Sequence, residues 1–119
     1  MCGIVGLFLK DASLEPKLGT MLADMLITMS DRGPDSAGIA IYSPAEPGMV
    51  KMSLQSDSAE IDFDGLADEL GTALAAAVTL QRKDTHAIVH LPEDKVGLAR
   101  ETLAKIRPGA RIMGVGESL

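Results

Sequence analysis

The single cysteine of the chain, Cys2, is the residue best placed to act as a nucleophile. Removal of Met1 would make Cys2 the N-terminal residue and put a thiol and a free α-amine on the same residue. An α-amine has a reference pKa of about 7.7–8.0, so it can accept a proton near neutral pH. An N-terminal amine of this kind can activate a hydroxyl or thiol nucleophile. Alternatively, Cys2 is an incidental residue near a frayed terminus, and its position alone favours that interpretation.

The loop at residues 32–38, Arg-Gly-Pro-Asp-Ser-Ala-Gly, is the second group that could do chemistry. Arg32 could neutralise a thiolate or orient a carboxylate substrate, because a guanidinium forms paired hydrogen bonds with a carboxylate. Gly33 permits a close approach of the backbone. Asp35 and Ser36 are typical of turns in which a side chain caps a backbone group. The loop is therefore either a functional turn or an ordinary surface turn.

The first half of the chain contains the elements that must position these residues. Residues 3–9 are apolar and predict a buried strand, which would hold Cys2 at a fixed point. Apolar residues at spacings of three and four predict an amphipathic helix over residues 16–29. Residues 37–42 and 49–54 predict two further strands that form a hairpin. Residues 1–55 are thus expected to form a nucleophile-bearing strand, helix and hairpin.

The second half of the chain, residues 56–119, predicts a helix followed by a βαβ segment. An alanine-rich helix is expected over residues 65–80. Residues 85–115 read as strand, helix and strand, which together form one βαβ unit with a right-handed crossover. The predicted fold class is therefore α+β, and the length of 119 residues suits a single domain.

Composition excludes several classes of protein. The net charge of −6, with no long basic run and only three aromatic residues, argues against a nucleic-acid partner. One cysteine excludes an intrachain disulfide and a multi-cysteine metal site. The longest apolar tract, residues 70–80, is too short to span a bilayer, and no secretory signal precedes it. The sequence therefore predicts a soluble, cytoplasmic protein without a membrane partner.

Weaker signals predict no metal or nucleotide site. His86 and His90 have a zinc-like spacing for a helix, but the residues between them favour a strand and structural histidines. Gly114 and Gly116 follow a predicted strand, as in a dinucleotide loop, but the motif is incomplete. The carboxylates between residues 57 and 69 are typical of a solvated acidic surface.

Taken together, Met-Cys-Gly-Ile-Val-Gly at residues 1–6 and the loop at 32–38 resemble class II glutamine amidotransferases, which are N-terminal-nucleophile (Ntn) hydrolases. Residues 3–42 are similar to the glutamate-synthase-related GlxB subgroup, the separate amidotransferase subunit of methylamine–glutamate N-methyltransferase-type complexes. The resemblance implies Ntn-hydrolase-like layers of sheet and helix, of which this chain would hold a part.

The same resemblance implies a glutaminase half-reaction, in which Cys2 attacks the side-chain amide of glutamine and releases ammonia. It implies that Arg32 and Gly33 lie beside the nucleophile, whereas Asp35 and Ser36 support the loop. It implies no cofactor in this chain. It also implies a flavin-dependent, glutamate-synthase-like partner that receives the ammonia.

The chain departs from the family after about residue 43. Family members carry a substrate-binding His-Thr-Arg strand, an Asn-Gly oxyanion pair and an acidic residue for the glutamine amine, none of which occurs here. Loss of one oxyanion donor alone costs roughly 10²–10³ in rate. We therefore expect an incomplete amidotransferase domain that is inactive by itself. A non-catalytic regulatory or scaffold subunit with the same fold, and a small-molecule-binding α/β domain, remain as alternatives.

Overall fold

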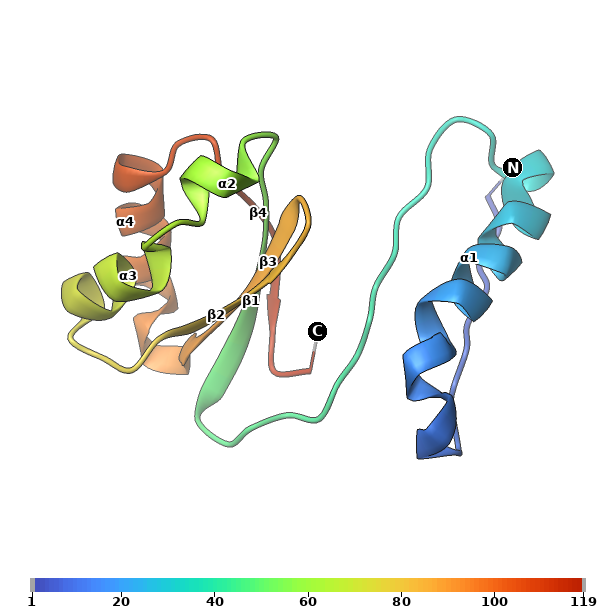
Figure 1. The fold of residues 1–119 in the computed structure, drawn as a ribbon, viewed down its shortest axis with the longest axis horizontal. Helices are drawn as coiled ribbons and strands as arrows, with labels where there is room; N and C mark the ends of the chain where they lie inside the picture. The colour runs from blue at the N-terminus through green and yellow to red at the C-terminus, as the bar shows by residue number, and fades with distance from the viewer. Residues whose placement is uncertain (1, 119) are drawn as a thin grey trace. The chain divides into compact units, whose positions relative to one another are not determined.

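The computed structural model describes residues 2–118, which form two compact units divided between Ile39 and Ala40 (Figure 1). The first unit carries helices, and the second carries a four-stranded antiparallel sheet with helices. The predicted α+β class is therefore confirmed. We call them the N-terminal unit and the C-terminal unit.

The N-terminal unit is built on one helix. The 3₁₀-helix η1 (Ala12–Lys17) leads into α1 (Leu18–Met29), which continues into the 3₁₀-helix η2 (Ser30–Arg32). The helix expected over residues 16–29 is thus confirmed, with its first two residues in the 3₁₀ turn. Its predicted apolar stripe is the half-buried side of α1, which consists of Leu18, Met21, Leu22, Met25, Leu26 and Met29.

The start of η1 is fixed by a side-chain cap. Asp11 accepts a hydrogen bond from the backbone N–H of Ser13, with an N–O distance of 2.9 Å. Hydrogen bonds from Ser13 lower the pKa of the Asp11 carboxyl. The cap satisfies a backbone donor that has no partner inside the helix.

The strand predicted over residues 3–9 is not formed, although half-buried and exposed residues alternate along this segment as they would in a strand. Val5, Leu7 and Leu9 are half-buried, whereas Ile4 and Phe8 are 95% and 84% exposed. Alternate burial is what an extended chain gives when one side of it is covered. A regular strand also needs a hydrogen-bonded neighbour, and no segment within residues 2–118 pairs with this one.

The predicted hairpin between residues 37–42 and 49–54 is also wrong. β1 (Met49–Gln55) does form, but its two edges pair with β3 (His86–Pro92) and β4 (Arg111–Gly116). Both edges of β1 are therefore occupied, and residues 37–42 form no strand. Their apolar side chains Ile39, Ile41 and Tyr42 are more than half exposed.

The C-terminal unit has the connectivity β-α-β-β-α-β. Its strands lie in the order β2-β3-β1-β4 and all neighbours are antiparallel. α2 (Ala59–Asp62) and α3 (Leu66–Leu74) connect β1 to β2 (Thr79–Lys83). The 3₁₀-helix η3 (Glu93–Lys95) and α4 (Val96–Ile106) connect β3 to β4. This connectivity and strand order are those of the ferredoxin-like, split βαβ arrangement.

The βαβ unit predicted over residues 85–115 is therefore present in a split form. β3 and β4 are parallel to each other because both are antiparallel to β1, but β1 lies between them. The covered side of β1 is wholly apolar, with Met52 and Leu54 fully buried, as is the covered side of its neighbour β3. A strand with such a buried side is stabilised at the centre of a sheet, which accounts for the insertion.

The helix predicted over residues 65–80 is shorter in the structure. α3 ends at Leu74 and is followed by Ala75, whose φ of 50° is left-handed, and β2 then begins at Thr79. Leu66, Leu70 and Leu74 form the buried side of α3 as the spacing predicts. Helix ends of this kind are usually marked by glycine, so an alanine at the position gives little warning in the sequence.

One hydrophobic core holds the C-terminal unit together. α3 and α4 lie on one face of the sheet, and the buried side chains of both meet those of β1 and β3 (Figure 1). The core consists of Val50, Met52, Leu54, Ala59, Phe63, Leu66, Leu70, Leu74, Ala87, Val89, Leu91, Ala99 and Leu103. The opposite face of the sheet carries no helix of this unit.

Arg107 ties the two helical connections together at the edge of this core. Its guanidinium donates to the carbonyl oxygens of Asp62 and Asp64 over 2.9 and 3.1 Å. It also forms a two-point pair with the Glu69 carboxylate, over 2.8 and 3.1 Å. The hydrogen bond to Glu69 raises the pKa of Arg107 further above its ordinary value. This end of α4 is thereby fixed to the α2–α3 connection.

Candidate functional site

The N-terminal unit brings the two chemistry-bearing parts of the sequence together. A Cβ atom placed on Gly3 would overlap Cε of Met29 and would lie 3.7 Å from Cβ of Arg32. The backbone at Gly3 therefore passes directly over the end of α1 and the turn that follows it. Cys2 is the adjacent residue, and its thiol is free and exposed. The first residues and the Arg32 turn thus occupy the same end of the helix.

The Arg32 turn is set by the way α1 ends. Arg32 is the last residue of η2, and the N–H of Gly33 closes that turn on the carbonyl oxygen of Ser30 over 3.3 Å. The Arg32 side chain is exposed and has no hydrogen-bond or ion-pair partner among residues 2–118. Its guanidinium is consequently available to a ligand carboxylate or to an anionic intermediate.

The remaining predicted site residues lie further along the same loop. Gly33 is half-buried, while Asp35 and Ser36 are exposed. Neither Asp35 nor Ser36 makes a side-chain hydrogen bond within the described part of the chain, so the predicted capping is not observed. The structure therefore places Gly33 next to Arg32 and leaves Asp35 and Ser36 as solvent-facing residues of the loop.

Met29 is the site residue that the sequence did not reveal. As the last methionine of an apolar stripe, it is indistinguishable in sequence from core-filling methionines at positions 21 and 25. In the structure it alone of these three contacts Gly3. Its position one turn before the Arg32 loop was the available signal.

The predicted removal of Met1 concerns a residue that lies outside the described residues.

The weaker candidates do not form sites. His86 and His90 both lie in β3, where four residues of rise separate them by about 13 Å, too far for one metal ion. Gly114 and Gly116 lie inside β4, paired with Ser53 and Lys51, so they are not a phosphate-binding loop. No group of three histidine, cysteine or acidic side chains within residues 2–118 is arranged to hold a metal ion.

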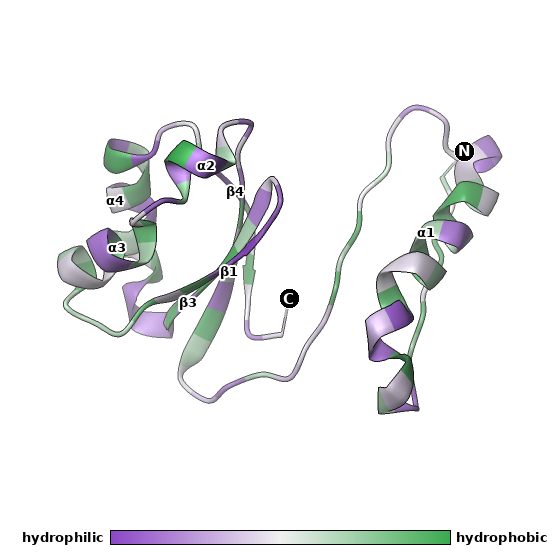
Figure 2. Ribbon diagram, in the orientation of Figure 1, coloured by the Kyte–Doolittle hydropathy of each residue, from purple (hydrophilic) through white to green (hydrophobic). Residues whose placement is uncertain are grey.

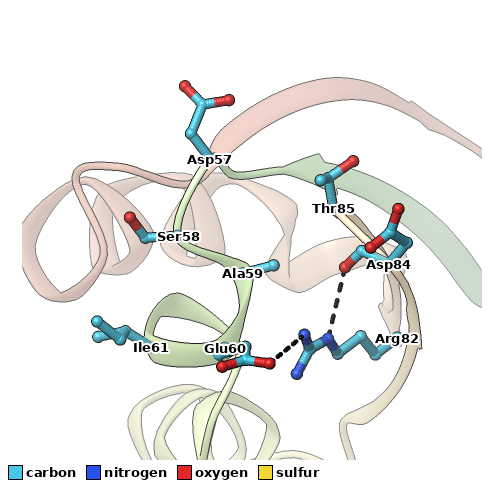
Figure 3. A pocket seen from close by; sticks show the side chains of 8 residues that line it. All are labelled: Asp57, Ser58, Ala59, Glu60, Ile61, Arg82, Asp84 and Thr85. Carbon is cyan, nitrogen blue, oxygen red and sulfur yellow. Dashed lines mark hydrogen bonds and ion pairs between the residues drawn. The ribbon is translucent and has the colours of Figure 1, made fainter.

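A shallow hollow of about 390 Å³ lies beside α2 and the β2–β3 turn (Figure 3). Its charged lining consists of Asp57, Glu60, Asp84 and Arg82. Arg82 points across it to Glu60, 3.8 Å away, and donates to the carbonyl oxygen of Asp84. Both members of the ion pair are well exposed, so it is a weak surface pair. The hollow contains no nucleophile or base in contact with another reactive group.

Between residues 2 and 118, no helix has both the length and the apolar character needed to cross a bilayer.

Comparison with known proteins relates the chain to two glutamine amidotransferase-like proteins. It is 54% identical over its whole length to the Glutamine amidotransferase-like protein GlxB of Rhizobium meliloti (strain 1021), and spans 39% of that protein. A 42-residue stretch, 35% of the chain, is 50% identical to a protein of Methanothermobacter thermautotrophicus (strain Delta H) named "Putative glutamine amidotransferase", and spans 13% of it. No protein-family model and no solved structure matches the chain.

Proposed function

We propose that this chain supplies the nucleophile-bearing part of a class II glutamine amidotransferase, with Cys2 as the nucleophile. The observation that carries the proposal is the contact of Gly3 with Met29 and Arg32, which puts Cys2 and a guanidinium that has no partner among residues 2–118 at one end of α1. The similarity to two glutamine amidotransferase-like proteins supports the same reaction class.

The proposed chemistry begins after Met1 has been removed. The α-amine of Cys2 accepts the thiol proton, and the sulfur attacks the side-chain amide carbon of glutamine. The tetrahedral intermediate collapses with loss of ammonia, whose additional proton comes from the ammonium of Cys2. Water then attacks the resulting γ-glutamyl thioester, which releases glutamate and restores the thiol. Arg32 binds the carboxylate of the substrate, because a guanidinium matches a carboxylate with two hydrogen bonds.

The complete reaction involves more than these residues. The chain spans 39% of its R. meliloti relative, so the substrate clamp and oxyanion donors are assigned to other parts of the full-length protein. We further propose that a longer protein containing this chain passes the ammonia to a flavin-dependent, glutamate-synthase-like partner. We expect the 119-residue chain alone to turn over glutamine negligibly, because a single missing oxyanion donor already costs roughly 10²–10³ in rate.

The decisive experiment measures glutamate released from glutamine by the full-length protein. Cys2→Ser is expected to reduce the release to background, and Arg32→Met to lower kcat/KM by about 10²-fold through misplacement of the substrate. Lys10→Met is the matched control, because it removes an exposed cation of the same unit that lies outside the proposed site. Full activity of Cys2→Ser would contradict the role of Cys2 as the nucleophile, and no release of glutamate by the unmutated full-length protein would favour the non-catalytic scaffold alternative.

A further inference from the structure

The uncovered face of the sheet in the C-terminal unit has an unusual charge distribution. None of the residues of β1, β2, β3 and β4 is acidic, although the chain has 17 acidic residues and a net charge of −6. The same four strands carry six residues that are cationic or can become so, which are Lys51, Arg82, Lys83, His86, His90 and Arg111. The acidic side chains are therefore confined to helices, turns and loops.

Register assigns most of these cations to the uncovered face. Ala87 and Val89 of β3 are buried under the helices, so the alternate residues His86, Ile88 and His90 face the other way. His86 of β3 pairs with Lys83 of β2 on one side and with Gln55 of β1 on the other. Gln55 in turn pairs with Arg111 of β4, so Lys83 and Arg111 lie on the same face as His86. The rim of this face is therefore cationic, and Ile88 is half-buried at its centre. We call it the open sheet face. In Figure 2 the tip of the β2–β3 hairpin is clearly hydrophilic.

At one end of the open sheet face, Lys51 binds the segment at residues 43–44 by hydrogen bonds to its oxygen atoms. The Lys51 ammonium donates to the carbonyl oxygens of Ser43 and Pro44, over 3.2 and 2.7 Å, and also to the Ser43 hydroxyl. Lys51 is only 6% exposed as a result. At the other end Lys83 and His86 are exposed. Arg111 is also exposed, at 58% of its side chain, and it forms an ion pair with the exposed Asp57 over 3.2 Å. Exposed pairs of this kind are readily exchanged for another carboxylate.

We propose that the open sheet face is a docking surface for an acidic protein surface on a partner molecule. The cations of this rim lie on strands that carry no acidic residue, and they steer and align a carboxylate-rich partner that replaces Asp57 at Arg111. Ile88 supplies an apolar contact inside that rim. Nucleic acid fits less well, because single-stranded binding relies on aromatic side chains and the four strands contain none. The proposal concerns the C-terminal unit alone and does not depend on the chemistry proposed for Cys2.

The test is a titration of the isotope-labelled 119-residue chain with a short poly-glutamate peptide, followed by NMR. Amide shifts are expected at β1–β4 residues that face away from the helices, and they should weaken as salt is added. Lys83→Glu combined with Arg111→Glu should raise Kd by about tenfold or more, since like charges would then face the peptide. Unchanged amide signals of Met52 and Val89 would show that the core of the variant is folded.

The matched control is Arg100→Glu combined with Lys105→Glu, which makes the same change in net charge on exposed positions of α4. This control should leave Kd within about twofold of the parent, because α4 lies on the other side of the sheet. Shifts that map to α3 and α4, or equal losses in both double variants, would overturn the proposal. So would no binding at all, or tighter binding of a single-stranded oligothymidylate than of poly-glutamate.

Discussion

Gly3→Ala tests the contact that joins Cys2 to the Arg32 turn. The added methyl group would overlap Cε of Met29, which must move by roughly 1 Å to restore an ordinary carbon–carbon contact. Because Cε is the end of a flexible side chain, we expect a cost near the lower end of the overpacking range, about 1 kcal/mol. The added methyl group would also lie 3.7 Å from Cβ of Arg32, which is an ordinary contact, so the Met29 side chain must move next to the Arg32 turn.

The consequence should appear in the reactivity of Cys2 in the full-length protein. A displacement of about 1 Å in a positioned group can cost up to roughly 10²-fold, and we expect Gly3→Ala to slow alkylation of Cys2 by a glutamine-analogue electrophile by about tenfold. Iodoacetamide, which needs no substrate orientation, should alkylate Cys2 in the variant and in the parent at similar rates. The ratio of the two rates is therefore the measured quantity.

Two further variants make the test specific. Gly6→Ala is the matched control, because a Cβ atom at Gly6 would have no neighbour within 4 Å, and it should leave the ratio unchanged. Met29→Ala added to Gly3→Ala removes the overlapping atom and should recover most of the ratio. Equal effects of Gly3→Ala and Gly6→Ala, or no recovery in the double variant, would refute the packing argument.

Three predictions concern the C-terminal unit, each measured by urea unfolding. Leu70→Ala should lower the free energy of unfolding by about 2–5 kcal/mol because Leu70 is fully buried. Ile61→Ala is the control, and it should change that free energy by less than about 0.5 kcal/mol because Ile61 is 75% exposed. Similar values for the two variants would contradict the assigned core. Arg107→Lys should lower the free energy of unfolding by about 1.5–3 kcal/mol, since an ammonium cannot reproduce the planar guanidinium that binds Glu69 and two carbonyl groups. Arg100→Lys, at an exposed arginine, is the control, and an equal loss in both variants would argue against this role of Arg107. Ala75→Gly should instead stabilise the unit by about 1 kcal/mol because φ is 50° at Ala75, and a destabilised variant would be inconsistent with that backbone conformation.

The sequence predicted those elements whose pattern is local. α1, α3 and α4 each show an apolar period of three and four residues, and β3 and β4 are short apolar runs bounded by turn residues. Pairing is not local, so residues 49–54 were correctly predicted as a strand but with the wrong neighbour. Residues 37–42 do not pair with β1, because β3 and β4, which lie more than thirty residues further along the chain, occupy both of its edges.

The site was predictable to the extent that motifs carry it. Cys2, Arg32 and Gly33 are candidates from residue type and from the family resemblance, and their roles stay predictions, although the contact at Gly3 brings their segments together. The contact of Met29 depends on a close approach of its side chain to the Gly3 backbone, which residue type does not encode. The cationic open sheet face was equally hidden, because its members are spread over four strands and only the pairing register gathers them.

The intact mass of the full-length protein, purified from cells and treated with a glutamine-analogue electrophile, reports directly on Cys2 as an N-terminal nucleophile. We expect a protein without Met1 that carries one adduct, and peptide mapping should locate the adduct on the Cys2 sulfur. A protein that keeps Met1 and still releases glutamate from glutamine would contradict it, as would an adduct on any other residue.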